Sequence, residues 1–169
     1  LERFTTKVGS GATPRGGQAV YLKSRVSHAL IRSQHVFDRR FDRDGIAFIS
    51  DEHAHELRNA AVRPRDILLN ITGDGVTFAR ACMVPDDVLP ACVNQHVAII
   101  RVDPLACVPG FLLAYLTHPV TKRYIESFNT GGSRRAITKG HIQSFDVPLP
   151  PLPVQQGIAS ILSAYDELI

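Results

Sequence analysis

The chain has 169 residues, with 44% hydrophobic and 21% charged side chains and a formal net charge of +3, a globular composition that predicts one domain with one sizeable core. No apolar run reaches about 18 residues and no apolar segment follows a basic start, so we expect neither a transmembrane helix nor a signal peptide. The three cysteines, Cys82, Cys92 and Cys107, lack the short regular spacing of a disulfide framework, which favours a reducing, cytoplasmic setting.

The first two thirds of the chain are expected to form loops and short strands. Four glycines and a proline within residues 9–17 predict a loop, and the missing third glycine argues against a dinucleotide fingerprint. Ser50 is followed by two acids and predicts the N-cap of a helix over residues 51–59. Apolar or alternating stretches predict strands over residues 29–33, 46–49, 66–72, 77–84 and 91–102. The Gly-Asp-Gly turn makes the third and fourth of these strands the clearest antiparallel hairpin.

The last third of the chain is expected to be mainly helical. Apolar residues at three- and four-residue spacing predict helices over residues 108–118 and 119–128. The residues expected on the inner face of the second helix are Val120, Tyr124, Ile125 and Phe128. Thr138 predicts the cap of a short helix over residues 139–144, and residues 154–169 predict an amphipathic helix whose pattern is still running at the last residue.

A proline-rich run separates the last two of these helices. Phe145, Val147 and Leu149 alternate along it, which predicts an edge strand because the prolines remove backbone donors. We expect this run to act as a rigid link that fixes the angle of the last helix. The alternative is that the prolines are a ligand for a proline-binding domain.

The motifs of common catalytic and metal sites are missing. The sequence contains no His-Glu-x-x-His, no Gly-x-Ser-x-Gly and no phosphate-loop lysine motif. Cys92 and His96 are four residues apart on an expected strand but have no further ligands nearby, so we interpret them as small buried core residues. A non-catalytic module is therefore favoured.

Positive charge is concentrated in two separated segments. Residues 1–45 carry nine basic and four acidic side chains, and residues 119–140 carry five and one, whereas the other two segments each have a net charge of −3. If folding brings the two basic segments together, they form the basic patch that is typical of a nucleic-acid binder. The alternative is that they are solvated loops on different faces.

Several segments occur together in an order that resembles a known family. They are a Gly-Ser-Gly-Ala-Thr-Pro loop at residues 9–14, Asp-Ile-Leu-Leu with Thr-Gly at 66–73, Val-Asn-Gln-His-Val at 93–97, Gly-Gly-Ser-Arg at 131–134, Ile-Thr at 137–138, and a proline run that leads into Gln-Gln-Gly-Ile-Ala at 147–159. This order resembles a target recognition domain of a type I restriction–modification specificity subunit. The proline run with Gln-Gln-Gly-Ile-Ala is the most specific part, and the resemblance covers nearly the whole chain.

The resemblance implies an α/β (α+β) fold with a mainly antiparallel, partly barrel-like sheet and short helices. Residues 1–153 would be the DNA target recognition domain, and residues 154–169 would begin a coiled-coil spacer helix. Such a domain reads one half of a bipartite sequence in double-stranded DNA, and methyltransferase subunits and a restriction subunit carry out the chemistry. The chain itself would be non-catalytic and bind no cofactor, because S-adenosylmethionine, ATP and Mg²⁺ would be bound by the partner subunits. The last helix would pair with a second recognition domain or with a second copy of the chain.

The candidate DNA contacts are the basic and polar side chains of the two basic segments, since arginine suits phosphate and guanine and glutamine suits adenine. They are Arg15, Lys23, Arg25, Arg32, Gln34, Arg39, Arg40, Ser133, Arg134, Arg135, Thr138 and Lys139, with Arg43 as a further charged-loop residue. Asn94 and Gln95 match the family pattern but are expected in the middle of a strand, where a structural role is favoured. The helix-interface residues are Ile158, Ile161, Leu162, Tyr165 and Leu168. Two alternatives stay open: a protein-interaction module that uses the last helix and the proline run, and the recognition domain of a fused type II enzyme.

Overall fold

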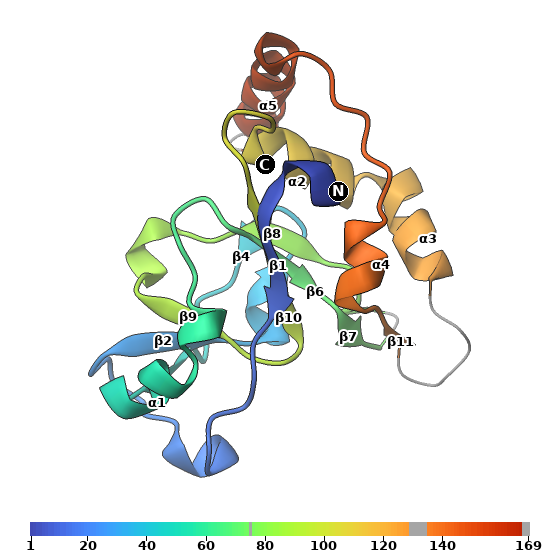
Figure 1. The fold of residues 1–169 in the computed structure, drawn as a ribbon. Coiled ribbons are helices and arrows are strands. Elements are labelled where there is room, and N and C mark those ends of the chain that lie inside the picture. Colours follow the sequence, from blue (N-terminus) through green and yellow to red (C-terminus); the bar gives the residue numbers. More distant parts are fainter. Residues whose placement is uncertain (75, 129–134, 167–169) are drawn as a thin grey trace.

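The computed structural model describes residues 1–74, 76–128 and 135–166. Its strands are β1 (Thr5–Ser10), β2 (His28–Ile31), β3 (Val36–Phe37), β4 (Arg40–Phe41), β5 (Ala47–Ile49), β6 (Ile67–Asn70), β7 (Thr72–Gly73), β8 (Ala81–Met83), β9 (Ala91–Val93), β10 (Val97–Val102) and β11 (Arg135–Ala136). Its α-helices are α1 (Asp51–Glu56), α2 (Pro109–Thr117), α3 (Pro119–Ser127), α4 (Lys139–Gln143) and α5 (Leu152–Asp166). Figure 1 shows α5 at one end of the molecule and the 11–20 loop at the other.

The strands form a mainly antiparallel α+β architecture, as expected. The central sheet has the order β1-β10-β6-β8, with every neighbouring pair antiparallel. A second sheet has the order β5-β2-β9, in which β2 and β9 run parallel. Two short ladders, β3-β4 and β7-β11, complete the described sheets, and the described strands do not close into a barrel.

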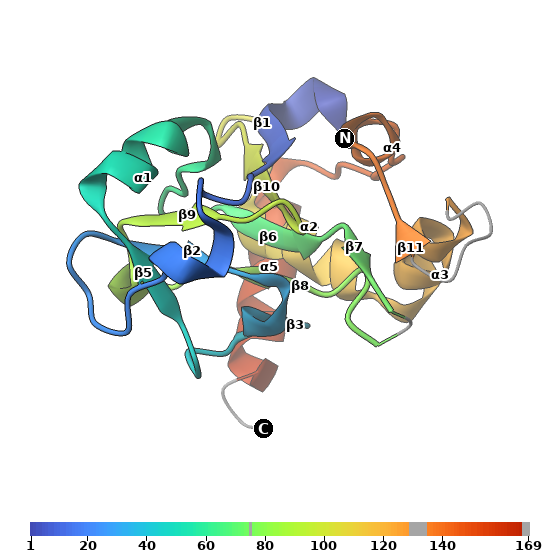
Figure 2. The same ribbon diagram turned by 90° about the horizontal axis from the view of Figure 1, so that it is seen from below.

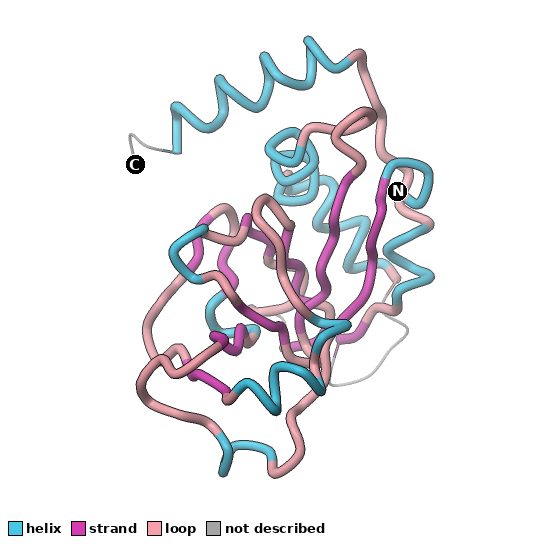
Figure 3. Tube along the Cα trace, turned by 60° about the vertical axis from the view of Figure 1, so that its left-hand side comes forward, coloured by secondary structure: helices cyan, strands magenta, loops and turns pink. Residues whose placement is uncertain are grey.

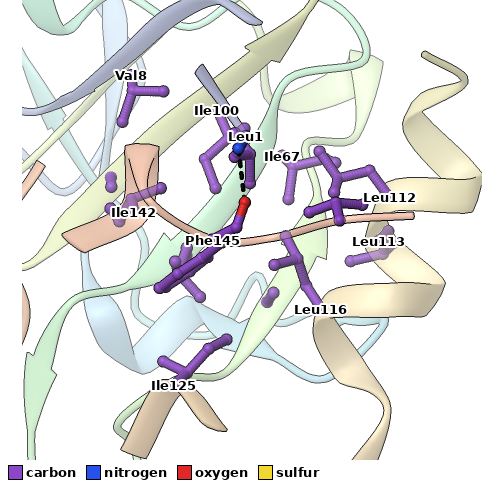
Figure 4. Close-up of a cluster of buried hydrophobic side chains, with 14 of the residues drawn as sticks. Leu1, Val8, Ile67, Ile100, Leu112, Leu113, Leu116, Ile125, Ile142 and Phe145 are labelled. Carbon is purple, nitrogen blue, oxygen red and sulfur yellow. Dashed lines mark hydrogen bonds between the residues drawn. The ribbon is translucent and has the colours of Figure 1, made fainter. Parts of the chain in front are cut away.

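The central sheet separates two hydrophobic cores because alternate residues of a strand point to opposite faces. Ile67 and Ile100 lie in a core with α2, α3, α4 and Phe145, which Figure 4 shows in close-up. Leu68 and Ile99, one residue along each strand, lie in the other core, between the central sheet and the β5-β2-β9 sheet. Figure 2 shows α1 beside β2 and β9, with α3 and β11 on the opposite flank. The strand alternation predicted over residues 97–102 is therefore confirmed.

The single long strand expected over residues 91–102 is wrong. The stretch forms β9 and β10, which belong to different sheets, with a turn at residues 94–96 between them. The turn forms because Asn94 satisfies backbone groups that a ladder would otherwise use: its Oδ1 accepts from His96 N at 3.0 Å and its carbonyl accepts from Val97 N at 3.3 Å. Such local side-chain bonding competes with strand pairing.

The hairpin predicted over residues 66–84 is confirmed by the antiparallel pairing of β6 and β8, but its returning strand is shorter than expected. It begins at Ala81, because residues 76–79 form turns in which Phe78 is buried and Ala79 has a φ of 61°. The helices at 51–56, 109–117, 119–127 and 139–143 lie within the predicted ranges, and Ser50 and Thr138 cap two of them as expected.

On the helical side, one prediction is wrong and another is confirmed only in part. Residues 145–149 form no strand: Phe145 and Val147 are buried, Leu149 is 40% exposed, and the Phe145 carbonyl accepts from the backbone nitrogen of Leu1 at 2.6 Å. On α3, Ile125 is buried as predicted, but the other buried residue is Thr121, whereas Val120 and Tyr124 are 58% and 39% exposed. Phe128 still packs against the core, and the Tyr124 ring lies edge-on to Phe145 with 5.9 Å between the ring centroids, so Val120 is the residue of the predicted face that the domain leaves most exposed.

The last helix begins two residues earlier than predicted, at Leu152, because proline is well tolerated in a first turn. It runs beside α2 and away from the strands (Figure 3). A Cβ on Gly110 of α2 would lie 3.1 Å from the Ala159 Cβ of α5, so the two helices approach closely. The predicted helix-interface residues of α5 lie in two environments, and Leu168 lies outside the described residues. Ile158 and Leu162 are half-buried toward α2, and Ile161 and Tyr165 are exposed.

None of the helices in the described part of the chain combines the length and the apolar composition that a bilayer crossing requires.

Candidate nucleic-acid interface

A polar groove of about 710 Å³ brings together four segments that are distant in sequence. These segments are the short helical turn that begins at Ser33, strand β7 with the following Asp74, the turn between β9 and β10, and strand β11. The second and the last of these segments are joined by the antiparallel pairing of β7 with β11. The residues that line the groove are Ser33, Thr72, Gly73, Asp74, His96, Arg135 and Ala136. We call this feature the polar groove.

The glycine loop is fastened to the turn that borders the polar groove. Gly11 N donates to the Asn94 carbonyl at 3.1 Å. A Cβ on Gly11 would lie 1.7 Å from the Val93 carbonyl oxygen, so this approach requires glycine. The contact holds Thr13, two residues further along, against Gln95.

Four side chains form a continuous hydrogen-bonded row from the glycine loop to β7. Thr13 Oγ1 donates to Gln95 Oε1 at 2.6 Å, and Gln95 Nε2 donates to His96 Nε2 at 3.1 Å. Because an amide nitrogen can only donate, His96 Nε2 accepts and the ring proton resides on Nδ1, which lies 2.6 Å from Thr72 Oγ1. The row holds the Gln95 amide in one orientation. The Thr72 hydroxyl accepts the bond from His96, so its own proton is not used within the row.

The β7 wall is shaped by a turn that uses its own carboxylate. Asp74 Oδ1 accepts from Val76 N at 3.0 Å, from Thr77 N at 2.9 Å and from Thr77 Oγ1 at 2.9 Å. The bonds from Thr77, then that from Val76, lower the pKa of the Asp74 carboxyl. Gly73 has a φ of 157°, and a Cβ there would lie 2.3 Å from Thr77 Oγ1, so the turn excludes a side chain at that position.

A buried asparagine supports the polar groove from beneath. Asn70 is fully buried, and its Nδ2 donates at 3.0 Å both to the Ser33 carbonyl and to the Thr77 carbonyl. It therefore links the two backbone segments that carry Ser33 and the β7 turn. Its Oδ1 has no hydrogen-bond partner among the described atoms.

One predicted contact of the second basic segment lies in the polar groove, and two lie elsewhere. Arg135 lines the groove, with Nη1 3.2 Å from Glu126 Oε1 and about one third of the side chain exposed. Thr138 caps α4, and its Oγ1 accepts from His141 N at 3.2 Å. Lys139 is exposed beside a separate cleft along β1. Ser133 and Arg134 lie outside the described residues.

The first basic segment is dispersed over several faces. Arg25 Nη1 donates to the Asp87 carbonyl at 3.2 Å and Arg32 Nη2 to the Gly45 carbonyl at 2.6 Å, so both guanidinium groups bind backbone. Lys23 and Gln34 are exposed. The described basic side chains therefore do not merge into one patch, but the two segments meet at two places. Lys7 and Lys139 line the same cleft along β1, and Ser33 and Arg135 line the polar groove.

Three further arginines form ion pairs. Two of them pair with other surface carboxylates, and the third pairs with a carboxylate of the last helix. Arg15 is 3.9 Å from Glu56 with its side chain 91% exposed. Arg43 donates to both Asp87 oxygens at 2.9 Å, which lowers the pKa of that carboxyl. Arg39 contacts Asp166 of α5 at 2.6 Å, so it fastens a surface turn to the last helix. The last predicted arginine, Arg40, is exposed, and its guanidinium stacks on Phe37.

The sequence did not single out Thr72 and His96 as site residues, and it placed Gln95 within a strand. The signal that was available is Asn-Gln-His directly before an apolar stretch, because asparagine favours turns over strand interiors. Arg80 was also missed; it lies in the negative middle segment and approaches Asp74 closely enough to contribute to its lowered pKa.

The described residues contain no group of three His, Cys, Asp or Glu side chains that could hold a metal ion. All three cysteines are buried, and burial raises the pKa of Cys82 to about 12 and those of Cys92 and Cys107 to about 11. These thiols are therefore protonated at neutral pH and lack the character of nucleophiles or ligands.

Comparisons with known proteins point in one direction. The sequence model of the family described as "Type I restriction modification DNA specificity domain" matches residues 58–169. The Type I restriction enzyme EcoBI specificity subunit of Escherichia coli is 28% identical over 131 residues, which are 76% of this chain and 26% of that protein. The putative type I restriction enzyme MjaX specificity subunit of Methanocaldococcus jannaschii is 36% identical over 78 residues, which are 46% of this chain and 18% of that protein.

The fold is also found among solved structures. A chain from a study of complex assembly and conformational transition in the type I restriction–modification (R-M) system superimposes with a TM-score of 0.72 at 19% identity. The match covers 99% of this chain and 37% of that one. The present chain thus spans well under half the length of the relatives it matches.

Proposed function

The chain belongs to the type I restriction modification DNA specificity domain family, and on that premise we propose that it recognises a short sequence in double-stranded DNA through the polar groove. The observation that carries the proposal is the row from Thr13 to Thr72, in which an exposed glutamine amide is held rigid beside a histidine and a hydroxyl. Its remaining donors and acceptors are positioned before any ligand arrives.

Reading a base edge needs donors and acceptors at fixed positions, and glutamine amides suit adenine in particular. Gln95 uses one N–H and one lone pair within the row, so one N–H and one lone pair remain for a ligand. The Thr72 hydroxyl accepts from His96 and keeps its own proton to donate. Preorganised groups of this kind lose little conformational entropy on binding, which favours discrimination between bases.

Phosphate contacts supply affinity without sequence information. Arg135 on the wall of the polar groove and Lys139 beside β1 are candidates for this role. Thr138 is engaged as a helix cap, and Arg25, Arg32 and Arg39 are engaged with backbone or Asp166, so we assign these four a structural role.

The division of labour in the parent protein is also a proposal. Residues 1–153 act as the recognition domain for one half of a bipartite target, and α5 begins a spacer helix whose exposed Ile161 and Tyr165 meet another helix. Methyltransferase and restriction subunits are the expected partners, and they would bind S-adenosylmethionine, ATP and Mg²⁺, leaving this chain non-catalytic. A cytoplasmic location follows from that assembly.

An apolar cavity favours a second, compatible function in protein binding. It measures about 850 Å³ and lies between α2, α3 and α5, with Tyr115, Tyr124 and Leu162 among its lining residues. It lies on the helical side, whereas β7 and β11 of the polar groove lie at the lower right in Figure 1. One chain can therefore bind DNA and a protein partner with different surfaces.

Fluorescence anisotropy with labelled random duplexes tests the DNA proposal. Binding should weaken as salt rises, with a linear relation between the logarithms of affinity and salt concentration. A folded chain that binds no duplex at about 50 mM salt, where such contacts are strongest, contradicts the proposal.

A further inference from the structure

A stack of two arginines on one aromatic ring lies outside the polar groove. The guanidinium groups of Arg40 and Arg80 each lie 4.5 Å from the centroid of the Phe37 ring. Phe37 and Arg40 face each other across the β3-β4 ladder, whereas Arg80 immediately precedes β8. The two cations are therefore held no more than twice that distance apart.

The hairpin that carries the stack is anchored by its other side chains. Asp38 forms an ion pair with Lys122 of α3, and Arg39 forms one with Asp166 of α5. Arg39 has a φ of 61°, a left-handed conformation that closes the two-residue turn between β3 and β4. With its neighbours bound to helices, Arg40 is left on the ring of Phe37.

The two stacked guanidinium groups form no ion pair within the described residues, which separates them from the arginines that are engaged with carboxylates. Arg39, Arg43, Arg101 and Arg135 each form an ion pair with a carboxylate. No hydrogen bond or ion pair links the side chain of Arg40 or Arg80 to any other residue in the described ranges. Two like charges held together by an aromatic face, with their N–H groups unused, are suited to a shared anion.

Arg80 of the stack lies near Asp74, which lines the polar groove, and near Asn70, which supports it. Arg80 lies close enough to Asp74, on the groove wall, to help lower the pKa of that carboxyl. The Arg80 carbonyl accepts from Asn70 N at 2.9 Å, and Asn70 supports Ser33 from beneath. A duplex seated in the groove would therefore bring its backbone near the stack.

We propose that Arg40, Phe37 and Arg80 form a phosphate-binding element that positions the DNA backbone while the polar groove reads bases. The inference rests on the proposed function. The occupant is a backbone phosphate of the bound duplex, because arginine matches phosphate oxygens with paired N–H donors and the two cations flank one site. Phe37 acts as a positioning residue that holds both guanidinium planes.

The test compares salt dependence with base discrimination. Arg40→Gln, Arg80→Gln and the double variant are titrated with one labelled duplex at several salt concentrations, and circular dichroism verifies folding. Arg3→Gln is the matched control, since Arg3 is exposed on the short helical turn Glu2–Phe4 and takes no part in the stack. Each lost phosphate contact should reduce the log–log salt slope by about 0.9 and weaken all duplex sequences by the same factor.

Phe37→Leu serves as a second variant, because it keeps an apolar side chain and removes only the aromatic face. It should weaken binding less than the double arginine variant while leaving the sequence preference unchanged. If wild-type protein binds DNA and the double arginine variant has the same slope as Arg3→Gln, the phosphate role is overturned while the DNA function stands. If wild-type protein binds no duplex, both proposals fail. Inorganic phosphate at millimolar concentration is also added as a competitor of the labelled duplex. If it displaces the duplex equally well from wild type and from the double variant, the stack is not the anion site.

Discussion

The side-chain Oε1 of Gln155 on α5 accepts a hydrogen bond from the backbone N–H of Val108, the N-cap of α2, at 2.9 Å. The amide nitrogen of Gln155 donates to the carbonyls of Ala106 and Pro150, at 3.2 Å and 2.8 Å. Gln155 is 1% exposed, so these bonds are shielded from water. One buried amide therefore joins the last helix, the proline run and the start of α2, which gives α5 a fixed origin on the domain.

Replacing Gln155 should destabilise the domain more than any change on the exposed face of α5. Gln155→Leu leaves three half-buried backbone groups without their partner, and we expect a loss of about 2–4 kcal/mol in the free energy of unfolding. Urea denaturation measures this loss. Gln156→Leu, at an exposed neighbouring position, is the control and should change stability by less than about 0.5 kcal/mol. Equal effects of the two variants would show that the amide does not anchor the helix.

The fully buried His35 predicts a loss of stability in mild acid. Its Nδ1 accepts from Arg32 N at 3.0 Å, and burial, with the nearby Arg32 charge, lowers its pKa from 6.5 to about 4. As the pH falls from about 6.5 to about 4, the unfolded chain takes up a proton that the folded chain cannot accept, so stability falls by up to roughly 3 kcal/mol. Above the unfolded pKa, His35 contributes no pH dependence.

Denaturant unfolding at several pH values checks this expectation. His35→Asn keeps an acceptor near Nδ1 and should remove this part of the slope, whereas His55→Asn, at an exposed position, should retain it. The assignment fails if the His35 variant loses stability between pH 6.5 and 4 as steeply as the wild type.

The buried thiols should report unfolding rather than surface chemistry. Because the pKa values of Cys82, Cys92 and Cys107 are raised by burial, we expect all three to resist alkylation at neutral pH. Mass spectrometry after pulsed iodoacetamide should show modification only as urea unfolds the chain. Rapid labelling of any of them in native buffer would mean that its core opens locally.

Base reading and phosphate binding should separate by mutation of Gln95, in the hydrogen-bonded row beside the polar groove, and of Arg135, on its wall. Gln95→Ala is expected to cost about 1–3 kcal/mol at one base position and little elsewhere. Arg135→Ala is expected to weaken binding to every sequence and to reduce the salt slope by about 0.9. Competition titrations against single-base variants of one duplex distinguish the two patterns, with Gln156→Ala as the control. If both variants affect all sequences equally, Gln95 does not read a base.

The sequence predicted the local elements well because they depend on neighbours. Ser50 and Thr138 cap their helices through side-chain hydrogen bonds to nearby backbone, so the helix starts can be predicted from neighbouring residues. Residues 97–102 alternate between two cores, and this alternation is also a local pattern. The partition of residues 91–102 was missed because it depends on the Asn94 turn, which is completed by Gly11, far away in the chain. Hydrophobic periodicity carries no information about such a partner.

Site residues were harder to predict because charge does not reveal what a side chain contacts. Arg39 and Arg32 are predicted DNA contacts, and the structure adds intramolecular partners that the sequence did not indicate: Asp166 in α5 for Arg39 and the Gly45 carbonyl for Arg32. His96 and Thr72 became visible only when folding brought the β9–β10 turn beside β7. Their roles in DNA binding stay predictions, as do those of Arg135 and Lys139.

Selection from a pool of random duplexes, followed by sequencing, tests the central claim most directly. We expect the chain to enrich one short motif, and Gln95→Ala to change the preference at one position of that motif while the rest persists. Sequences from a folded, DNA-binding chain that match the starting pool would contradict recognition by the polar groove.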